Sequence, residues 1–483
     1  MTLDPATCYR ALRARDARFD GRFFVAVSST RIYCRPVCTV KPPRRENCRY
    51  YPSAAAAETA GYRPCLRCRP ELAPGNASVD ATSRLAQAAA SLIEDRALEV
   101  DGLPAVAARL GITDRHLRRA FGAEFGVSPV EFAQTQRLLL AKRLLTDTPL
   151  PVTEVAFASG FGSLRRFNAL FRERYRLQPA QLRRRMREAA TPGADALAFE
   201  LAYRPPYDWD AVSAFLGARA VAGVESLEGG RYRRTVRVAQ EGKDHLGWIE
   251  VGPSAKKPAL RISVSASLAR VLPPVLSRVK ALADLACNPV EVSAALGDLA
   301  KARPGMRVPG AFDGFEVAVR AILGQQVTVA AARTVAGRLA AALGDSFASP
   351  FPELRTVFPD AERVADATPA RIARLGMPGA RAKTILALAR AVADGALELV
   401  PNADVEATLE RLRALPGVGE WTAQYIAMRA LAWPDAFPHS DLGVLKALGT
   451  KDPKRALAAA EAWRPWRAYA VMHLWNSLEK DRA

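Results

Sequence analysis

The sequence predicts a multidomain protein that is mainly α-helical and has smaller parts in which strands and helices mix. Its 483 residues are enough for about three or four domains. Residues 80–188 and the C-terminal third carry apolar side chains at helical spacing, whereas Tyr232–Val238 and Leu260–Val264 alternate as strands do. Two turn-rich stretches, Glu71–Ser78 and Ala189–Ala194, separate these regions and mark two linkers.

Four domains are expected from this pattern. They are a cysteine module (1–76), a double helix-turn-helix domain (80–188), an α+β sheet subdomain (195–300) and a helical hairpin domain (301–483). The apolar share of 49% and the charged share of 24% are those of a globular protein. No apolar run approaches the roughly 20 residues of a membrane span, and the N-terminus lacks the pattern of a secretory signal. We therefore expect a cytoplasmic protein with no membrane partner.

The charge of the chain points to nucleic acid. Lys and Arg number 69 against 49 Asp and Glu, a net charge of +20. Residues 1–190 alone hold 32 basic and 18 acidic side chains. A basic surplus clustered in one part of a chain is the electrostatic footprint of nucleic-acid binding, although a basic proteome could also produce it.

Four of the seven cysteines have the spacing of a metal site. Cys34 and Cys38 form one close pair and Cys65 and Cys68 another, with 26 residues between the pairs. Four thiolates are a standard tetrahedral ligand set for Zn²⁺, so one structural zinc ion is expected. Its simplest role is to stabilise a module of about 70 residues whose core would otherwise be thin. We interpret Cys8 and Cys48 as bystanders.

The surroundings of these cysteines suggest a second role. Basic residues and tyrosines are interleaved with them, so the module can hold DNA. A zinc ion with four thiolates carries a formal charge of about −2, which repels phosphate. Alkylation of one thiolate would yield a neutral thioether and remove part of that repulsion. Such a centre could both accept an alkyl group and report that it has done so.

Residues 16–70 resemble the N-terminal domain of the Ada-type adaptive-response proteins, through DARFDGRFF, TRIYCRPVC, RREN and GYRPCLRCRP. That family transfers a methyl group irreversibly from a DNA methylphosphotriester to one zinc-bound cysteine. The resemblance implies that Cys34 is the acceptor and that Thr30, Lys41 and Arg63 contact DNA. Thr39 occupies a position at which the family carries a DNA-contacting arginine.

Two helix-turn-helix units are expected in the second domain, at 103–126 and 152–183. In each, a second helix turns an apolar stripe inward and leaves basic side chains exposed, among them Arg118, Arg165 and Arg166. A recognition helix in the major groove requires this division. An ordinary helical bundle with solvated arginines would show it too. The second unit, however, resembles the AraC-type DNA-binding signature over AFASGFGSLRRFNALFRERYRLQPAQLR.

The hairpin domain is named for Leu415–Gly419, the pentapeptide LPGVG, which precedes an expected helix. Gly417 and Gly419 let the backbone approach a phosphate, and the helix N-terminus adds N–H donors with a favourable dipole. This is a sequence-independent DNA anchor, although the same pentapeptide can be a simple turn. Asp441 follows 20 residues after Trp421.

A hairpin followed at that distance by an aspartate resembles the helix-hairpin-helix DNA glycosylases. Residues 197–479 resemble 3-methyladenine DNA glycosylase II of the AlkA type more closely, through the segments YRPPYDWDAVSAFLGARAVAGVE, CNP, ALGDLAKARPG, VRAILGQQVTVA, LGMPGARA and WRPWRAYAVMHLW. The resemblance implies that Asp441 is the catalytic carboxylate, although it could also be a helix cap. It also places Trp421, Tyr425 and Trp475 in the base pocket; Trp475 could equally be a core residue.

Gln326 occupies the position at which AlkA-type enzymes insert an apolar wedge into DNA. Glycosylases that also cut the strand carry a lysine just after the hairpin, where this chain has Trp421. We therefore expect a monofunctional glycosylase. No cysteine follows Cys287, so we expect no iron–sulfur cluster. No Pro-Cys-His run occurs, so base-methyl transfer is not expected.

Together these features predict an alkylation-damage response protein of the bacterial cytosol and nucleoid. It would combine methylphosphotriester acceptance, transcriptional regulation and hydrolytic release of N-alkylated purines. Its expected partners are double-stranded DNA and, at a promoter, RNA polymerase, and it is expected to act as a monomer. The alternatives are a transcriptional regulator whose hairpin domain is a non-catalytic DNA clamp, and a repair enzyme whose first half merely targets it to DNA.

Overall fold

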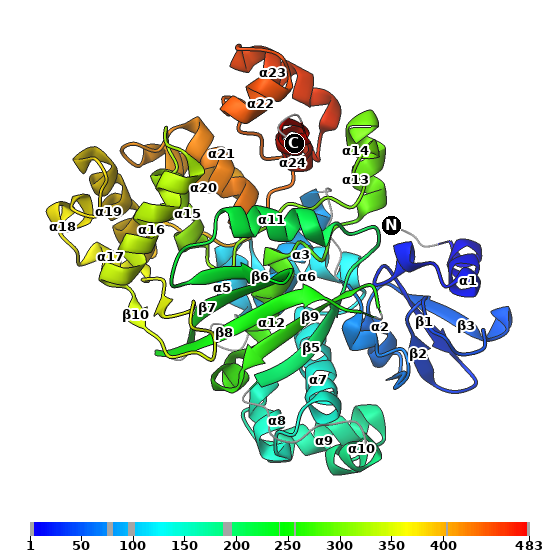
Figure 1. Cartoon of the computed structure of the whole chain (residues 1–483). Helices are drawn as coiled ribbons and strands as arrows, with labels where there is room; N and C mark the ends of the chain where they lie inside the picture. Colours follow the sequence, from blue (N-terminus) through cyan, green and yellow to red (C-terminus); the bar gives the residue numbers. More distant parts are fainter. Residues whose placement is uncertain are drawn as a thin grey trace.

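A computed structural model describes residues 4–74, 81–94, 102–186, 196–240, 242–255, 257–401 and 404–480. Of the two predicted linkers, 189–194 lies outside these ranges, and 71–78 lies partly outside them. Figure 1 shows the sheet subdomain at the centre, the cysteine module to its right and the C-terminal helices at the top. The multidomain, mainly α-helical fold was predicted correctly. In the described part of the chain, no helix combines the length and apolar character needed to cross a membrane.

The cysteine module is built around a four-stranded sheet of strand order β3-β1-β2-β4. Strands β2 and β4 are parallel, and Tyr33 pairs with Pro64, so the residues that follow, Cys34 at the end of β2 and Cys65 just after β4, lie side by side. The chain thereby brings its two cysteine pairs together. The elements are α1 (Pro5–Ala14), η1 (Ala17–Phe19), β1 (Phe24–Val27), β2 (Ile32–Cys34), η2 (Arg45–Asn47), β3 (Cys48–Tyr51), α2 (Ala54–Thr59), β4 (Arg63–Pro64) and η3 (Pro70–Leu72).

Both predicted helix-turn-helix units are present. Gly111 and Gly160 lie at the turns with φ of +68° and +89°, a conformation that glycine adopts without strain. Thr113 and Ser163 cap the second helix of each unit by accepting a backbone N–H. The helices are α3 (Ala81–Glu94), α5 (Gly102–Arg109), α6 (Asp114–Phe125), α7 (Pro129–Asp147), α8 (Val152–Ala158), α9 (Leu164–Tyr175) and α10 (Pro179–Met186).

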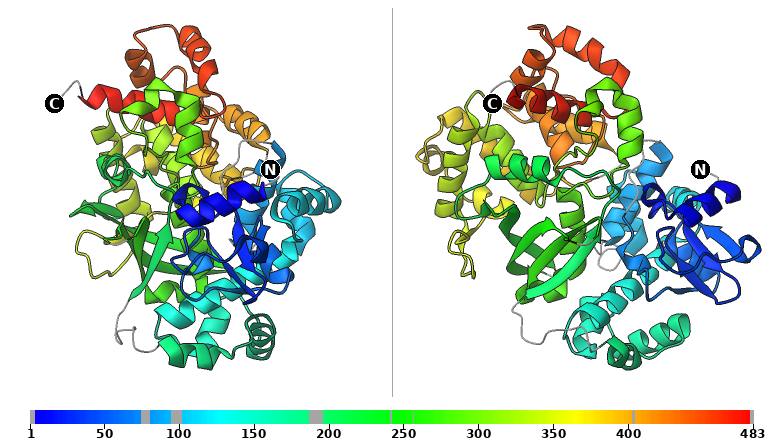
Figure 2. Two further views of the ribbon diagram at one scale, coloured as in Figure 1. Left: turned by 90° about the vertical axis from the view of Figure 1, so that its right-hand side faces the viewer. Right: turned by 45° about the vertical axis from the view of Figure 1, so that its right-hand side comes forward.

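Each helix-turn-helix unit shares a hydrophobic core with a different neighbour. The core of the first unit includes Ala55 and Ala56 of the cysteine module, and the two stay side by side in both further views (Figure 2). The core of the second unit continues into the sheet subdomain. There Arg143 of α7 donates to the Glu200 carbonyl at 2.6 Å and lies 4.8 Å from the Phe199 ring. Sequence periodicity identifies buried faces but not these partners.

The sheet subdomain contains a five-stranded antiparallel sheet of order β5-β9-β8-β7-β6. The strands predicted at Tyr232–Val238 and Leu260–Val264 lie within β7 and β9. The elements are β5 (Ala196–Ala202), α11 (Trp209–Ala218), β6 (Glu225–Glu228), β7 (Arg231–Gln240), β8 (Lys243–Pro253), β9 (Ala259–Ser265), η5 (Ala266–Val271) and α12 (Leu272–Leu282).

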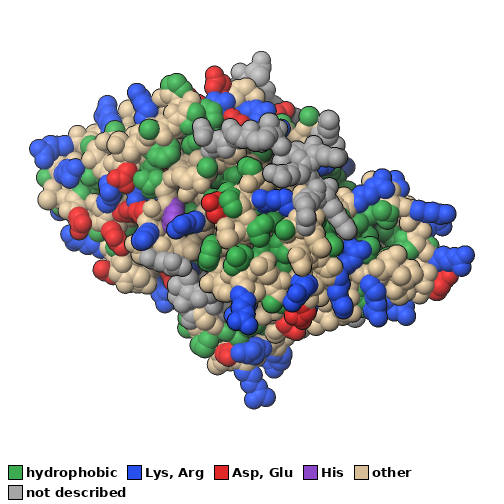
Figure 3. Space-filling model, turned by 90° about the horizontal axis from the view of Figure 1, so that it is seen from below, with side chains coloured by type: hydrophobic (Ala, Val, Ile, Leu, Met, Phe, Trp, Pro, Cys, Tyr) green, Lys and Arg blue, Asp and Glu red, His purple; other side chains and the backbone are tan. Residues whose placement is uncertain are grey.

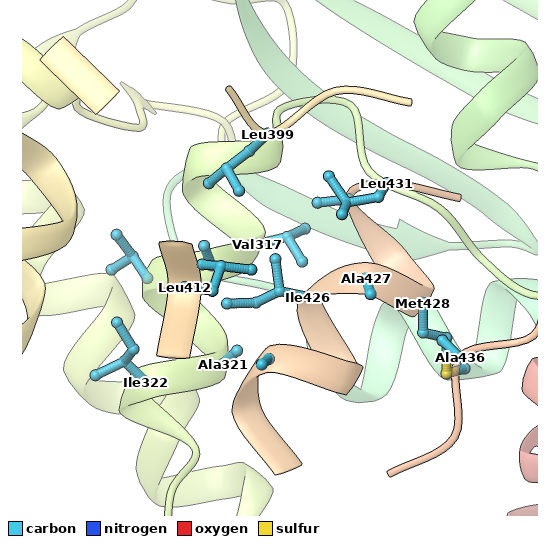
Figure 4. Close-up of a cluster of buried hydrophobic side chains, with 14 of the residues drawn as sticks. Val317, Ala321, Ile322, Leu399, Leu412, Ile426, Ala427, Met428, Leu431 and Ala436 are labelled. Atoms are coloured by element: carbon cyan, nitrogen blue, oxygen red, sulfur yellow. The ribbon is translucent and has the colours of Figure 1, made fainter. Parts of the chain in front are cut away.

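The hairpin domain packs its helices around a core to which α15, α20 and α21 contribute inward-pointing aliphatic side chains (Figure 4). A two-stranded sheet, β10 with β11, was not predicted, because two-residue strands are too short to show alternation. The elements are α13 (Pro289–Leu296), α14 (Asp298–Lys301), α15 (Gly314–Leu323), α16 (Val329–Leu343), β10 (Asp345–Ser346), β11 (Thr356–Val357), α17 (Ala361–Ala365), α18 (Pro369–Ala373), α19 (Gly379–Ala393), α20 (Val405–Ala414), α21 (Glu420–Arg429), α22 (Leu442–Ala447), α23 (Pro453–Ala460), η6 (Glu461–Trp463) and α24 (Arg467–Lys480).

Candidate active site and metal centre

A cavity of about 1200 Å³ opens in the hairpin domain where α15, α16 and α21 meet the start of α22. Arg219 and Val221, which follow α11, also line it, so the sheet subdomain closes one side. Seven residues that the sequence analysis identified as candidates line the cavity, although they are spread over positions 326 to 475 of the chain. They are Gln326, Gly417, Gly419, Trp421, Tyr425, Asp441 and Trp475.

Asp441 is held by three N–H donors. The indole Nε1 of Trp475 donates to Oδ1 at 2.8 Å, and that of Trp421 donates to Oδ2 at 2.9 Å. The backbone N–H of Val444 also donates to Oδ1, at 3.0 Å. Asp441 is therefore a helix cap for α22 and, at the same time, a half-buried carboxylate whose plane two indoles fix.

Gly443 makes this arrangement possible. A Cβ at this position would lie 2.9 Å from Cδ1 of Trp475 and 3.0 Å from Oδ1 of Asp441. Both distances are too short for ordinary contacts, so any larger residue must displace the indole or the carboxylate.

Replacement of Gly443 by alanine tests the importance of this packing. If Asp441 is the catalytic carboxylate that the sequence predicts, Gly443→Ala should slow its reaction about tenfold or more, because small displacements of a positioned group are costly. Binding of DNA, the predicted substrate, should change little. Single-turnover rates and DNA affinity measure the two effects. Gly379→Ala is the control for a glycine outside the cavity, because a Cβ at Gly379 meets no neighbouring atom within 4 Å, and an equal loss of rate in both variants would contradict the explanation.

Three aromatic side chains form a wall around the carboxylate. Trp421 and Tyr425 stack at 5.4 Å between ring centroids, and Tyr425 and Trp475 lie 6.4 Å apart with tilted planes. Trp475 stacks on Phe215 of α11 at 6.2 Å. Trp475 thus packs on the core and also faces Asp441, and electron-rich faces of this kind attract a cationic ring.

Arginines at the cavity were not predicted from the sequence. Arg429 donates to the hydroxyl of Tyr425 at 2.9 Å, and Arg219 lies 3.7 Å from the Phe215 ring. Burial alone would raise the pKa of Tyr425, but the positive charges of Arg429, Arg219 and Arg320 outweigh it and lower the pKa. A sequence rich in arginine offers no signal that selects these three.

The loop that carries Gln326 is attached to the hairpin. Gln325 donates to the carbonyl of Gly417 and to Oγ1 of Thr422, both at 2.9 Å. Arg381 donates to the Gln325 carbonyl at 2.6 Å. Gln326 itself is exposed, with φ of +54°. The exposed tip and the hairpin are thereby held as one unit.

Gly417 of the hairpin, whose carbonyl accepts the hydrogen bond from Gln325, also leaves no room for a larger residue. Gly417 has φ of +83°, and a Cβ there would lie 2.3 Å from Oγ1 of Thr384. Only glycine fits both the backbone conformation and the space. Gly417 and Gly419 are both exposed at the N-terminal end of α21, as an anchor for a phosphate requires.

The four predicted metal ligands form one cluster. The sulfur atoms of Cys34, Cys38, Cys65 and Cys68 all lie within 4.8 Å of one another. Tetrahedral Zn²⁺ with bonds of about 2.3 Å needs sulfur atoms about 3.8 Å apart, so the donor set fits this ion. The cysteine module holds a Zn²⁺ site of four thiolates.

The predicted DNA-contacting residues of the module lie within four sequence positions of one of the four cysteines. Thr30, Thr39 and Lys41 are exposed and Arg63 is half-buried. Among the cysteines, Cys68 is the more exposed, while Cys34 is 6% exposed. Exposure therefore does not select Cys34 as the acceptor, and its assignment depends on the resemblance.

Buried ion pairs join the metal centre to α7. Arg69, next to Cys68, pairs with Asp147 at 2.6 Å and with Glu71 at 3.0 Å. Glu71 in turn pairs with Lys142 at 2.5 Å, and both side chains are almost fully buried. Removal of one partner of such a pair leaves an uncompensated charge, so these contacts hold the module in one position on α7.

A second buried contact uses Glu58 of α2. Tyr33 donates to Glu58 at 2.9 Å, and Thr135 of α7 donates to its other oxygen at 3.4 Å. Burial raises the pKa of Glu58 to about 7, and these hydrogen bonds only partly oppose the shift. The raised pKa means that the folded protein loses stability from this group as the pH rises from about 4.5 to about 7.

Glu58→Gln removes the buried charge and keeps an acceptor for Tyr33. We expect the free energy of unfolding of this variant to be higher than that of the wild-type protein. The increase in the free energy of unfolding should be larger at pH 8 than at pH 5 by about 2 kcal/mol. Denaturant titrations at both pH values measure this difference. The exposed Glu46→Gln is the control, and a gain independent of pH would show that Glu58 is not the cause.

The recognition helices present the expected basic side chains. Arg118 on α6 is exposed and pairs with Asp114 at 2.9 Å, and Arg165 and Arg166 on α9 are exposed. Seen from below, the face that carries α9, α10 and the cysteine module shows more Lys and Arg than Asp and Glu (Figure 3). The buried stripes are Leu117, Phe121 and Phe125 in α6, and Phe167 and Phe171 in α9.

Four family models match the chain along its length. They are the metal binding domain of Ada (7–71), a helix-turn-helix domain (106–185), the AlkA N-terminal domain (198–313) and the HhH-GPD superfamily of base excision DNA repair proteins (319–466).

Relatives match both the whole chain and its halves. The probable bifunctional transcriptional activator/DNA repair enzyme AlkA of Mycobacterium tuberculosis is 41% identical, over 98% of this chain and 96% of its own. The DNA-3-methyladenine glycosylase 2 of Escherichia coli is 39% identical over 57% of this chain and 96% of its own. The bifunctional transcriptional activator/DNA repair enzyme Ada of E. coli is 35% identical over 29% of this chain and 39% of its own.

Proposed function

The chain belongs to the family of bifunctional transcriptional activator/DNA repair enzymes, and we propose which of its residues carry each activity. It is an alkylation-damage response protein that combines DNA-3-methyladenine glycosylase activity with Ada-type methyl acceptance and transcriptional regulation. DNA is its partner. We assign the four domains to 1–76, 80–188, 195–300 and 301–483.

Asp441 is the catalytic carboxylate of the glycosylase. The observation that carries this assignment is the pair of indole hydrogen bonds that fix both its oxygens at the wall of an aromatic cavity. An N-alkylated purine is cationic, so it can leave with the electron pair of the glycosidic bond without prior protonation. The carboxylate stabilises the positive charge that develops on the sugar. Water then adds to C1′, and its proton passes to Asp441 or to solvent.

Trp421, Tyr425 and Trp475 receive the base after it leaves the stack. Their faces favour a cationic ring over a neutral one. Gly417 and Gly419 anchor the phosphate backbone, and Gln326 lies at the rim beside the DNA. Because Trp421 occupies the position of the lysine in strand-cutting relatives, the enzyme hydrolyses the N-glycosidic bond of the base and leaves the strand intact.

Cys34 is the methyl acceptor of the cysteine module. Bound zinc keeps its ligands as thiolates at neutral pH. The Sγ of Cys34 attacks the methyl carbon, the methyl–oxygen bond breaks, and a phosphodiester anion leaves. Thr30, Thr39, Lys41 and Arg63 hold the backbone during this transfer. One negative charge is lost from the module, so its repulsion of DNA decreases.

The methylated protein then binds a promoter more tightly. Arg118, Arg165 and Arg166 lie on the two recognition helices and face the major groove. RNA polymerase is the further partner of this activity, and the protein acts as a monomer in the bacterial cytosol, at the nucleoid.

Footprinting distinguishes regulation from simple targeting to DNA. We expect the methylated protein to protect a defined promoter sequence with at least about tenfold higher affinity than the unmethylated protein. Protection without sequence preference, or without dependence on methylation, would support the alternative in which the first half only delivers a repair enzyme to DNA.

A further inference from the structure

The mouth of the cavity carries an unusual amount of exposed aliphatic surface. Leu442 is 83% exposed, the highest value among the exposed large hydrophobic side chains of the described residues. Val327 and Val329 are 40% and 46% exposed. All three line the cavity of Asp441. A leucine left in water forgoes the favourable free energy of burial, so a side chain this exposed at a functional cavity marks a contact surface.

The position of Leu442 in the chain determines what covers it. Leu442 follows Asp441 directly, and consecutive Cα atoms are about 3.8 Å apart. When the Asp441 carboxylate reaches a deoxyribose, the backbone of Leu442 therefore lies within about 10 Å of the same nucleotide, and the side chain of Leu442 lines the same cavity. Gly417 and Gly419, the phosphate anchor, line the same cavity. The occupant of this surface is thus the lesion-bearing duplex, and not a protein or a lipid.

The residue at the expected wedge position cannot supply an apolar contact. Gln326 is polar, and its loop is attached to the hairpin through Gln325. A base that leaves the stack exposes the apolar faces of its neighbours, and an apolar side chain fills that space best. Leu442 is the exposed aliphatic side chain nearest in sequence to the reacting group.

We propose that Leu442 packs against the gap that the flipped nucleotide leaves and so holds the opened duplex over Asp441, while Gln326 makes only polar contacts at the rim. This inference depends on the proposed glycosylase activity. It adds a DNA-contacting residue that discriminates an opened duplex from an intact one, because only the opened duplex offers apolar base faces to Leu442.

The test compares binding to two duplexes, one with a stable abasic-site analogue and one undamaged. Leu442→Ala should bind the abasic duplex about tenfold more weakly and the undamaged duplex as the wild-type protein does. Leu442→Met should bind both duplexes normally, and Gln326→Ala should lose less affinity than Leu442→Ala. Leu457→Ala is the matched control, since Leu457 is 37% exposed and lies outside the cavity.

A fluorescent 2-aminopurine next to the lesion reports stacking in the same complexes. Its signal should fall in Leu442→Ala, because the neighbours restack. Unchanged affinity and signal in that variant, or an equal loss on both duplexes, would overturn the proposal. Release of methylated purines by the wild-type protein is measured in parallel. If the wild-type protein releases no methylated purines, the proposed glycosylase activity is wrong. If it releases them but Leu442→Ala matches the wild-type protein in affinity and fluorescence, only the proposed role of Leu442 is wrong.

Discussion

Asp441→Asn is expected to lower the rate of release of methylated purines about a thousandfold, while the affinity for DNA stays near that of the wild-type protein. Among the described residues, Asp441 is the only carboxylate that lines the cavity, and loss of a single preorganised electrostatic group costs about 10²–10³ in rate. Asparagine still caps α22, so the helix should keep its position. The amide NH₂ would face one of the two indole N–H donors, so one of the two indole hydrogen bonds is lost, but no charge is left buried without a partner.

Single-turnover kinetics on alkylated DNA measure this effect, with gel-shift affinity as the companion measurement. Asp452→Asn is a matched control, because Asp452 caps α23 in the same way but lies outside the cavity. Residual release within about tenfold of the wild-type rate would show that Asp441 is a structural cap only. Loss of DNA binding together with rate would show that the substitution disturbs the cavity as a whole.

Cys34→Ser is expected to abolish methyl acceptance and to release the metal from the cysteine module. A hydroxyl is a poor substitute for a thiolate ligand of Zn²⁺, and three cysteines hold the ion far less tightly than four. The small cores of the module then lose their central constraint, so its unfolding should come at lower denaturant concentration. Cys48 lies outside the cluster, so the Cys48→Ser variant should still bind zinc and accept the methyl group.

Mass spectrometry identifies the acceptor in the wild-type protein. After reaction with methylphosphotriester DNA, fragmentation of the peptide that carries Cys34 and Cys38 should place one methyl group on Cys34. A methyl group on Cys38, Cys65 or Cys68 would contradict the assignment. This measurement matters because Cys68, and not Cys34, is the more exposed residue of the cluster.

Local patterns predicted most of the elements and the four cysteines of the metal site. The paired cysteines and the LPGVG hairpin are short-range signals, since their chemistry depends on residue type and spacing. The role of Asp441 was predicted from the resemblance to the glycosylases and stays a prediction. The strands at Tyr232–Val238 and Leu260–Val264 were visible because alternation reports a sheet with one buried face. The two-residue strands β10 and β11 were missed because they are too short for any period.

Contacts between distant segments could not be predicted in the same way. The two indole bonds to Asp441 join α21 and α24 across the cavity, and no local pattern encodes them. Gly443 is ordinary in the sequence and becomes essential only beside Trp475. The ion pairs that join Arg69 and Glu71 to α7 likewise depend on the packing of two domains.

The most direct test of the central assignment, a monofunctional glycosylase built around Asp441, is incubation of the full chain with alkylated duplex DNA. Released bases are separated by chromatography, and the strands are examined before and after mild alkali. We expect free methylated purines and strands that break only after alkali. Breaks before alkali, with a protein–DNA adduct trapped by borohydride, would contradict the monofunctional chemistry. No release despite intact DNA binding would show that the hairpin domain is a non-catalytic clamp.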